Sequence, residues 1–358
     1  MNPTRRLRDL GQSLWLDNIR RDMFGDGTLV RYIDDFGVSG LTSNPTIFEN
    51  AIKRTPAYDA AIRSKQGKSP EALFFDLAIE DLARAADLFR QVHEDTNRID
   101  GWVSLEVSPL LAYDTPTTLA EAQHLHARAG RRNLFIKIPG TPQGVPAIEE
   151  AIFAGVPINV TLIFSLAQYL AAAEAFTRGI ERRIEAGLNP EVASVASLFV
   201  SRWDVAVAAK VPPALHNRLG VAMAKRIFRA YRRLLGSARW QRIFNLGGRP
   251  QRLLFASTGT KDPHASDVLY VRSLAAPFTI DTMPEATLQA FAAHGELDAP
   301  LDPDDDGCES VIAEFERAGI DVDALGEQLQ QDGAAAFVKS WNELLAVIET
   351  KAGLAKAR

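Results

Sequence analysis

Eight short apolar segments alternate with helical patterns along the 358 residues, and this alternation limits the fold more than any other feature. Each segment ends at or next to a polar residue, a glycine or a proline, as buried parallel strands do. Eight strands alternating with helices predict an α/β protein of the (β/α)8 barrel type. The predicted strands are Leu14–Asp17, Gly37–Thr42, Gly101–Val107, Leu134–Ile138, Gly155–Thr161, Val192–Val200, Arg252–Ser257 and Pro277–Ile280.

The competing fold is a doubly wound open sheet. That fold would carry a glycine-rich phosphate-binding turn after its first strand, and residues 16–20 contain no glycine. The barrel is therefore favoured. We predict a single barrel domain over residues 1–358, with a helical insertion at about 205–250 and additional C-terminal helices at about 309–352.

Composition excludes several classes of protein. A net charge of −5 provides no basic field for nucleic acid, and no apolar run reaches membrane-spanning length. Residues 1–10 are charged and lack the apolar region of a signal peptide. Cys308, the only cysteine, excludes internal disulfides and fits a reducing cytoplasm. His124 and His126 would face different sides of a helix, so we expect no metal site.

Lys137 interrupts the apolar strand Leu134–Ile138, which ends at Pro139 and Gly140. Burying a charged amine costs several kcal/mol unless the amine is paired or neutral. A neutral lysine amine is a nucleophile that forms a Schiff base with a carbonyl group. The alternative interpretation is that the side chain extends from the strand end into solvent.

Polar residues recur at the carboxyl ends of the predicted strands, which converge on one mouth in a barrel. Taken singly, each has a structural explanation, such as a helix cap, a backbone contact or a surface ion pair. No requirement of folding gathers two acids, a lysine and two asparagines in one buried place, so the set predicts a functional site. The residues are Asp17, Asn44, Glu106, Lys137, Asn159, Thr161, Ser197, Arg202 and Ser257.

The set makes chemical sense for a lysine imine. Lys137 would attack a ketone, and Glu106 would shuttle the protons that let water leave. Asp17 would remove a hydroxyl proton as a carbon–carbon bond breaks. Asparagine amides hold hydroxyl groups, Thr161 would position a water, and an arginine with serine hydroxyls is a common phosphate grip.

Seven stretches that contain or adjoin these polar residues resemble the transaldolase family. They occur in the family's order and on the expected strands. The C-terminal helical pattern with Phe337 and Trp341 is similar as well. The combination of stretches is specific, whereas any one alone would be weak. They are Leu16–Asp17, Gly40–Thr46, Val103–Glu106, Phe135–Thr141, Ile158–Phe164, Ser197–Val200 with Arg202, and Thr282–Pro284.

The resemblance implies a Schiff-base transferase of the pentose phosphate pathway, and the single cysteine leads us to expect it in the cytoplasm. Such an enzyme moves a dihydroxyacetone unit from sedoheptulose 7-phosphate to glyceraldehyde 3-phosphate, giving erythrose 4-phosphate and fructose 6-phosphate. By motif position, Lys137 is the imine lysine, and Glu106 is the proton shuttle through a water held by Thr161. Asp17 is the base for the C4 hydroxyl. The resemblance implies no metal and no organic cofactor, and leaves open a monomer or a homodimer.

For the substrate, the resemblance implies that Asn44 and Asn159 hold the dihydroxyacetone hydroxyls, and that Ser197 and Arg202 meet the phosphate. The chain departs from the family after the seventh strand. Many members carry an arginine there, whereas this chain has Ser257 and, four residues later, Lys261. We expect both to bind substrate, although lysine lacks the bidentate fork of arginine. The length and the insertion resemble the larger bacterial subgroup.

Two alternatives remain at this point. A fructose 6-phosphate aldolase would release free dihydroxyacetone, and that subgroup resembles this chain at the lysine but lacks a glutamate at the position of Glu106. A non-catalytic barrel that binds sugar phosphates would not need Lys137 and Glu106 together.

Overall fold

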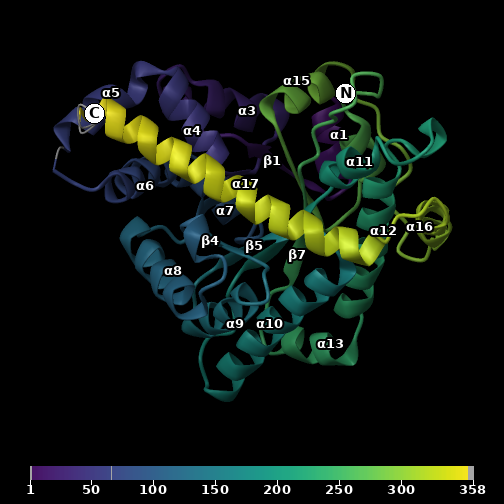
Figure 1. Ribbon diagram of the computed structural model, residues 1–358. Helices are drawn as coiled ribbons and strands as arrows, with labels where there is room; N and C mark the ends of the chain where they lie inside the picture. The colour runs from purple at the N-terminus through teal and green to yellow at the C-terminus, as the bar shows by residue number, and fades with distance from the viewer. Residues whose placement is uncertain (1, 66, 354–358) are drawn as a thin grey trace.

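Within residues 2–65 and 67–353, which the computed structural model describes, eight parallel strands close into a barrel in chain order. This confirms the predicted (β/α)8 architecture (Figure 1). Positions 1, 66 and 354–358 of the predicted domain lie outside the described residues. The strands are β1 (Ser13–Asp17), β2 (Gly40–Thr42), β3 (Trp102–Glu106), β4 (Leu134–Pro139), β5 (Ile158–Ile163), β6 (Ser194–Phe199), β7 (Gln251–Ala256) and β8 (Ile280–Met283).

Helices surround the barrel, and none among the described residues is long and apolar enough to cross a membrane. The α-helices are α1 (Pro3–Asp9), α2 (Asp22–Gly25), α3 (Thr28–Phe36), α4 (Pro45–Arg54), α5 (Asp59–Ser64), α6 (Pro70–Leu88), α7 (Arg90–Asp95), α8 (Thr115–Ala129), α9 (Gly144–Ala154), α10 (Leu166–Glu185), α11 (Ser201–Val207), α12 (Leu219–Leu235), α13 (Ala238–Asn245), α14 (Leu269–Ser273), α15 (Glu285–His294), α16 (Gly307–Arg317) and α17 (Val322–Lys351). Short 3-10 turns are η1 (Pro56–Tyr58), η2 (Pro109–Leu111) and η3 (Pro213–Leu215).

The predicted position of the eighth strand is wrong by three residues. Residues 277–279 enter the strand through a turn in which Phe278 has φ +64° and a side chain that is 64% exposed. The strand itself begins at Ile280 and contains Asp281 and Thr282, both buried. A polar pair is a poor sequence signal for a buried strand, whereas the apolar residues just before it were the stronger signal.

The lumen is apolar in its lower layer and polar at its mouth. Trp102 stacks on Phe135 with ring centroids 4.1 Å apart, and Trp15 lies 6.2 Å from the same ring. Side chains two residues apart share a face of a strand. The same strands therefore carry Asp17 and Lys137 two residues beyond Trp15 and Phe135, and Glu106 four residues beyond Trp102, all above these rings. The aromatic layer packs the barrel below the polar residues, which is the layered filling typical of this fold.

α12 and α13 lie in the interval predicted to be an insertion. Asp204 of α11 anchors the start of α12, because its carboxylate accepts the backbone amides of Leu219 and Gly220 at 2.9 and 3.2 Å. A side chain at Gly220 would come within 2.6 Å of the Val200 carbonyl oxygen, so only glycine allows this close approach. The interval therefore packs directly on the barrel through α11.

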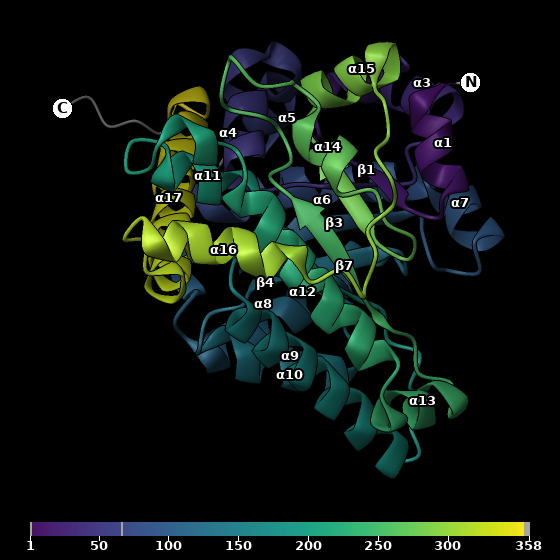
Figure 2. The same ribbon diagram turned by 90° about the vertical axis from the view of Figure 1, so that its right-hand side faces the viewer.

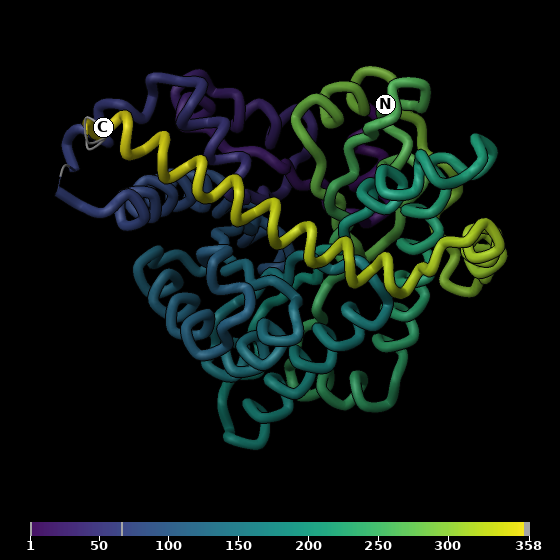
Figure 3. The backbone as a smooth tube through the Cα atoms, viewed as in Figure 1, coloured from purple at the N-terminus to yellow at the C-terminus, as the bar shows by residue number. Residues whose placement is uncertain are grey.

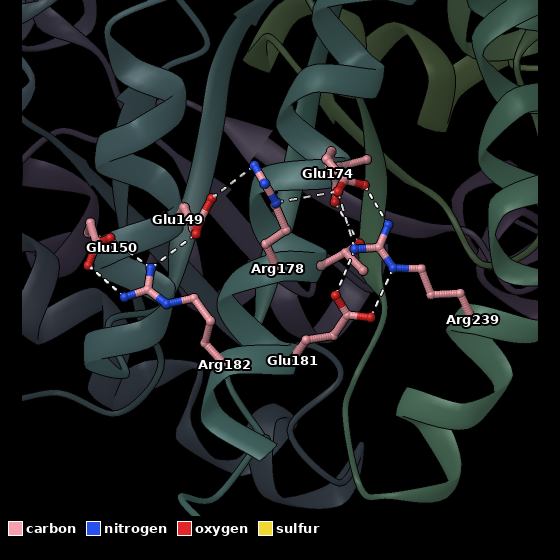
Figure 4. A network of polar contacts seen from close by, with 9 residues as sticks. Glu149, Glu150, Glu174, Arg178, Glu181, Arg182 and Arg239 are labelled. Carbon is pink, nitrogen blue, oxygen red and sulfur yellow. Dashed lines mark hydrogen bonds and ion pairs between the residues drawn. The ribbon is translucent and has the colours of Figure 1, made fainter. Parts of the chain in front are cut away.

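Ion pairs connect α10 to its neighbours α9 and α13 on the outside of the barrel (Figure 4). Arg182 lies 2.7 Å from Glu150, and Arg239 lies 2.6 Å from Glu174. A single exposed pair is worth about 0–1 kcal/mol, whereas bidentate pairs joined in a network, as at Arg239, contribute more reliably. The labelled members are Glu149, Glu150, Glu174, Arg178, Glu181, Arg182 and Arg239.

The long helix α17 crosses the carboxyl-terminal mouth of the barrel (Figures 1 and 3). Seen from the side in Figure 2, α17 and α1 lie on opposite sides of the barrel. The far part of α17 packs on α6, where the Trp341 ring lies 5.0 Å from the Phe74 ring. At its end, the Lys351 amine lies 2.7 Å from Asp59. Several independent contacts therefore hold α17 across the mouth.

We predict that the stability of the fold decreases less with rising pH in Asp281→Asn than in the wild type. Burial raises the pKa of Asp281 from 3.8 to about 7, although the Thr258 hydroxyl donates to it at 2.8 Å. The folded state holds this proton more tightly than the unfolded chain. The stabilisation is present below about pH 4 and is lost as pH rises towards 7.

The measurement is the melting temperature of both proteins at several pH values between about 4 and 8. The wild type should lose more stability across this range than the variant, because an amide does not ionise. Parallel curves for the two proteins would contradict the assignment.

Candidate active site

The Lys137 amine lies inside the barrel mouth. The side chain is 5% exposed, which shows that the interpretation of a lysine extending into solvent is wrong. Its Nζ donates to the backbone carbonyl of Ser43 at 3.0 Å and lies 3.5 Å from Oε2 of Glu106. The register pairs Glu106 with Lys137 across β3 and β4, which places both side chains on the same face.

Glu106 is buried beside the amine, and neither carboxylate oxygen has a hydrogen-bond partner among the described residues. Burial raises the pKa of Glu106 from 4.5 to about 7, and the nearby charge of Lys137 opposes this rise. A carboxyl group with this pKa both gives and takes protons near neutral pH. The carboxyl group is thus suited to shuttle protons to and from a group bound at the amine.

Asp17 lies half-buried at the end of β1 and accepts a hydrogen bond from the Thr42 hydroxyl at 2.7 Å. Burial raises the pKa of Asp17, and the charge of Lys137 is the largest opposing effect. Thr42 in turn lies 2.7 Å from the hydroxyl of Thr282 on β8. Thr42 on β2 therefore holds the Asp17 carboxyl group from the side of β3 and Glu106, and Thr282 on β8 supports Thr42 from the other side of β1.

Asn159, Ser197 and Thr161 are buried on the next two strands. Ser197 donates to Oδ1 of Asn159 at 2.6 Å, and Asn159 donates to the Ser104 hydroxyl at 3.1 Å. The hydroxyl of Thr161 has no partner within the described part of the chain. The register pairs Lys137 with Asn159, so this polar row continues the lumen face that carries the amine.

Arg202 is held between two aromatic rings. Its guanidinium lies 4.9 Å from the centroid of the Phe199 ring and 5.8 Å from that of Phe337 on α17. Burial lowers the pKa of Arg202, while the charges of Asp17 and Glu106 oppose the change. Among the described residues, Arg202 forms no ion pair with the neighbouring Asp204. Asp204 instead accepts from the Tyr270 hydroxyl at 2.8 Å.

The remaining predicted residues lie at the edge of the site. Asn44 caps α4, where its Oδ1 accepts the backbone amide of Ile47 at 3.0 Å. Ser257 has φ +57° and its hydroxyl lies 2.9 Å from that of Ser201. Lys261 is exposed. Its charge opposes the rise in the pKa of Asp17, so Lys261 lies on the same side of the barrel as the mouth.

Sequence reasoning missed several groups that support the site. The carbonyl of Ser43 and the hydroxyls of Thr42 and Ser104 lie within stretches that resemble the family. Their position in these stretches was the sequence signal that could have identified them. Gln330 on α17 had no such signal, because it contacts only the backbone of distant strands. Among the described residues, no group of three or more His, Cys, Asp or Glu side chains is arranged to hold a metal.

The fold and the site together define a class: a parallel (β/α)8 barrel with a buried lysine and two carboxyl groups at its carboxyl-terminal mouth. Residues 14–348 match the family described as Transaldolase/Fructose-6-phosphate aldolase, and the chain belongs to this family.

Known relatives extend over nearly the whole chain. A transaldolase of Thiobacillus denitrificans is 42% identical, with 97% of this chain and all of that protein aligned. A transaldolase of Frankia alni is 41% identical over 98% of both chains. A transaldolase of Neisseria gonorrhoeae is 38% identical over 95% of this chain and 97% of the relative.

Proposed function

We propose that this chain is a transaldolase that transfers a dihydroxyacetone unit between sugar phosphates through a Schiff base on Lys137. The observation that carries the proposal is the buried contact of 3.5 Å between the Lys137 amine and Glu106, whose pKa burial raises to about 7. The transaldolases of three bacteria, each aligned over nearly the full chain, support the same activity.

The first step joins the amine to the donor ketone. The neutral Lys137 Nζ adds to C2 as the C=O π bond opens, and the proton that the nitrogen loses passes to the oxygen, which becomes a hydroxyl. Glu106 then protonates this hydroxyl, directly or through a water held by Thr161, so that the C–O bond breaks and water leaves. The nitrogen lone pair forms the C=N bond, which leaves a protonated imine and an ionised Glu106.

The second step breaks the bond between C3 and C4. Asp17 takes the proton of the C4 hydroxyl, which becomes the carbonyl of the departing aldose phosphate. The electron pair of the C3–C4 bond moves towards the imine nitrogen and forms an enamine. Addition of this enamine to an acceptor aldehyde reverses the same steps, and hydrolysis of the new imine releases the product ketose.

Substrate binding follows from the polar groups around the amine. Asn44, Asn159 and Ser197 would hold the hydroxyls of the dihydroxyacetone unit. The guanidinium of Arg202, with Ser257 and Lys261 at the rim, would meet the phosphate. No metal or organic cofactor is needed for these steps.

We further propose a cytoplasmic enzyme of the pentose phosphate pathway that folds as one domain over residues 1–358. The single cysteine, which is buried, supports a reducing compartment. The proposal leaves open whether the enzyme is a monomer or a homodimer.

We predict that borohydride traps a stable adduct between fructose 6-phosphate and the wild-type protein, and that Lys137→Ala abolishes it. Intact mass and peptide mapping locate the adduct. Lys53→Ala, which changes an exposed lysine on α4, is the matched control and should trap normally. An adduct retained in Lys137→Ala would show that another amine reacts.

Measuring dihydroxyacetone with the same protein separates the two reactions of the family. A transaldolase releases sedoheptulose 7-phosphate from fructose 6-phosphate and erythrose 4-phosphate, with little free dihydroxyacetone. Release of dihydroxyacetone at an equal rate without the acceptor would indicate an aldolase. Binding of the sugar phosphate without any adduct would indicate a non-catalytic barrel.

We predict that Glu106→Gln slows imine formation by roughly two orders of magnitude or more, because the proton shuttle is lost. The wild-type rate should also fall as pH rises through about 7, where the acid form of Glu106 is lost. Borohydride trapping at successive times, repeated at several pH values, measures both effects. A variant that keeps the wild-type rate and pH profile would remove Glu106 from the mechanism.

We predict that Lys261→Ala raises KM for phosphorylated sugars more than for their unphosphorylated counterparts. The reason is the loss of a cation at the rim of the mouth, which attracts the phosphate. Steady-state kinetics with fructose 6-phosphate and fructose measure the difference. Lys210→Ala, another exposed lysine, is the control. Equal changes for both sugars would show that Lys261 does not contact the phosphate.

A further inference from the structure

Gln330 on α17 connects the ends of two neighbouring barrel strands. Its side-chain amide donates to the carbonyl of Gly140 at 2.9 Å and to the carbonyl of Leu162 at 3.0 Å. The side chain is 7% exposed, so both hydrogen bonds are shielded from water. The two carbonyls belong to the ends of β4, which carries Lys137, and β5, which carries Thr161.

The carbonyl of Leu162 lies at an irregular point of β5. Between Val160 and Ile163 the strand advances three residues while β6 advances two, from Ala196 to Leu198, so β5 contains one extra residue. Leu162 adopts φ +58°, a conformation that a non-glycine residue reaches only at an energetic cost. Such a bulge persists only where the surrounding structure holds it, and it redirects neighbouring side chains.

Two contacts hold this irregular stretch in place. The Gly140 amide donates to the carbonyl of Thr161 at 2.7 Å, which continues the β4–β5 ladder. Gln330 binds the next carbonyl, that of Leu162. The Leu162 side chain packs below α17 at Gly333, where an added Cβ would lie 2.9 Å from it. α17 therefore both packs against the segment that carries Thr161 and forms a hydrogen bond to it.

Thr161 and Glu106 share an unusual feature. The Thr161 hydroxyl and both Glu106 oxygens are buried, and none has a hydrogen-bond partner among the described residues. Buried polar atoms of this kind need a bridging group such as an ordered water. A bridge between Thr161 and Glu106 would depend on the direction of the Thr161 hydroxyl, and a bulge redirects the side chains beside it.

We propose that Gln330 is a positioning residue for proton transfer. Its hydrogen bonds hold the bulge of β5 in place, and the bulge orients the Thr161 hydroxyl for proton exchange with Glu106. The proposal rests on the proposed function, since it concerns the dehydration step at Lys137. Gln330 does not contact the amine. It acts on the reaction only through the backbone of Leu162 and the side chain of Thr161.

A purely structural role is separable from this one. Trp341 packs on Phe74, and Lys351 pairs with Asp59, so α17 stays on the barrel without the Gln330 amide. Removing the amide leaves two buried carbonyls without this donor and lowers stability whatever its role. The test therefore needs a readout that stability alone does not move.

The test uses Gln330→Met, which keeps the size of the side chain and removes the donor. Gln328→Met is the matched control, because Gln328 lies on the same helix but is exposed and donates to Asp332 at 2.7 Å. We expect Gln330→Met to slow borohydride-trapped imine formation and kcat by about tenfold, part of the general acid–base contribution, with little change in KM. Gln328→Met should match the wild type. If Gln330→Met does not fold, Gln330→Asn serves instead, since its shorter amide does not span both carbonyls.

Thr161→Val supplies the decisive comparison, because it removes the hydroxyl and keeps the shape of the side chain. If Gln330 acts through this hydroxyl, the double variant with Gln330→Met forms the imine at the rate of Thr161→Val alone. Independent, multiplying effects would overturn the proposal, as would a wild-type rate in Gln330→Met. A wild-type protein that forms no adduct would instead overturn the proposed function, and this result is distinct from the other two.

Discussion

The contact between the Lys137 amine and the Glu106 carboxyl group is the interaction on which the site depends. Removing both groups from water is unfavourable, and a distance of 3.5 Å recovers only part of that energy. The Ser43 carbonyl gives the amine a second partner at 3.0 Å, whereas the Glu106 oxygens have no hydrogen bond within the described residues. The pair is thus less well satisfied than a purely structural pair, which is the usual condition of groups that exchange protons with a substrate.

The barrel makes this arrangement possible through the simple period of its strands. Side chains that alternate by two residues place the Trp102 and Phe135 rings below Glu106 and Lys137. The same strands therefore supply the apolar packing of the lumen and the polar groups of the mouth. Because the aromatic layer closes the lower lumen, desolvation acts on the polar layer and raises the pKa of Glu106 to about 7.

Most of the fold follows from local sequence, and the exceptions have physical reasons. Seven strands were found from their apolar runs, but β8 was misplaced because Asp281 and Thr282 are buried polar residues that no periodicity reveals. Strand ends located the polar residues of the mouth, because the fold brings all such ends together. Gln330 escaped prediction since its two partners are backbone carbonyls 190 and 168 residues away, and backbone groups carry no sequence signal.

α17 shows why strands alone do not complete the site. The barrel positions the amine and the acids, and the carbonyls of Gly140 and Leu162 at the ends of its strands are bound from α17. A buried carbonyl needs a donor, and α17 provides one through Gln330. The same helix places Phe337 beside the Arg202 guanidinium. One element, far from the catalytic residues in sequence, thus satisfies the strand ends next to the amine and orients the cation expected to bind phosphate.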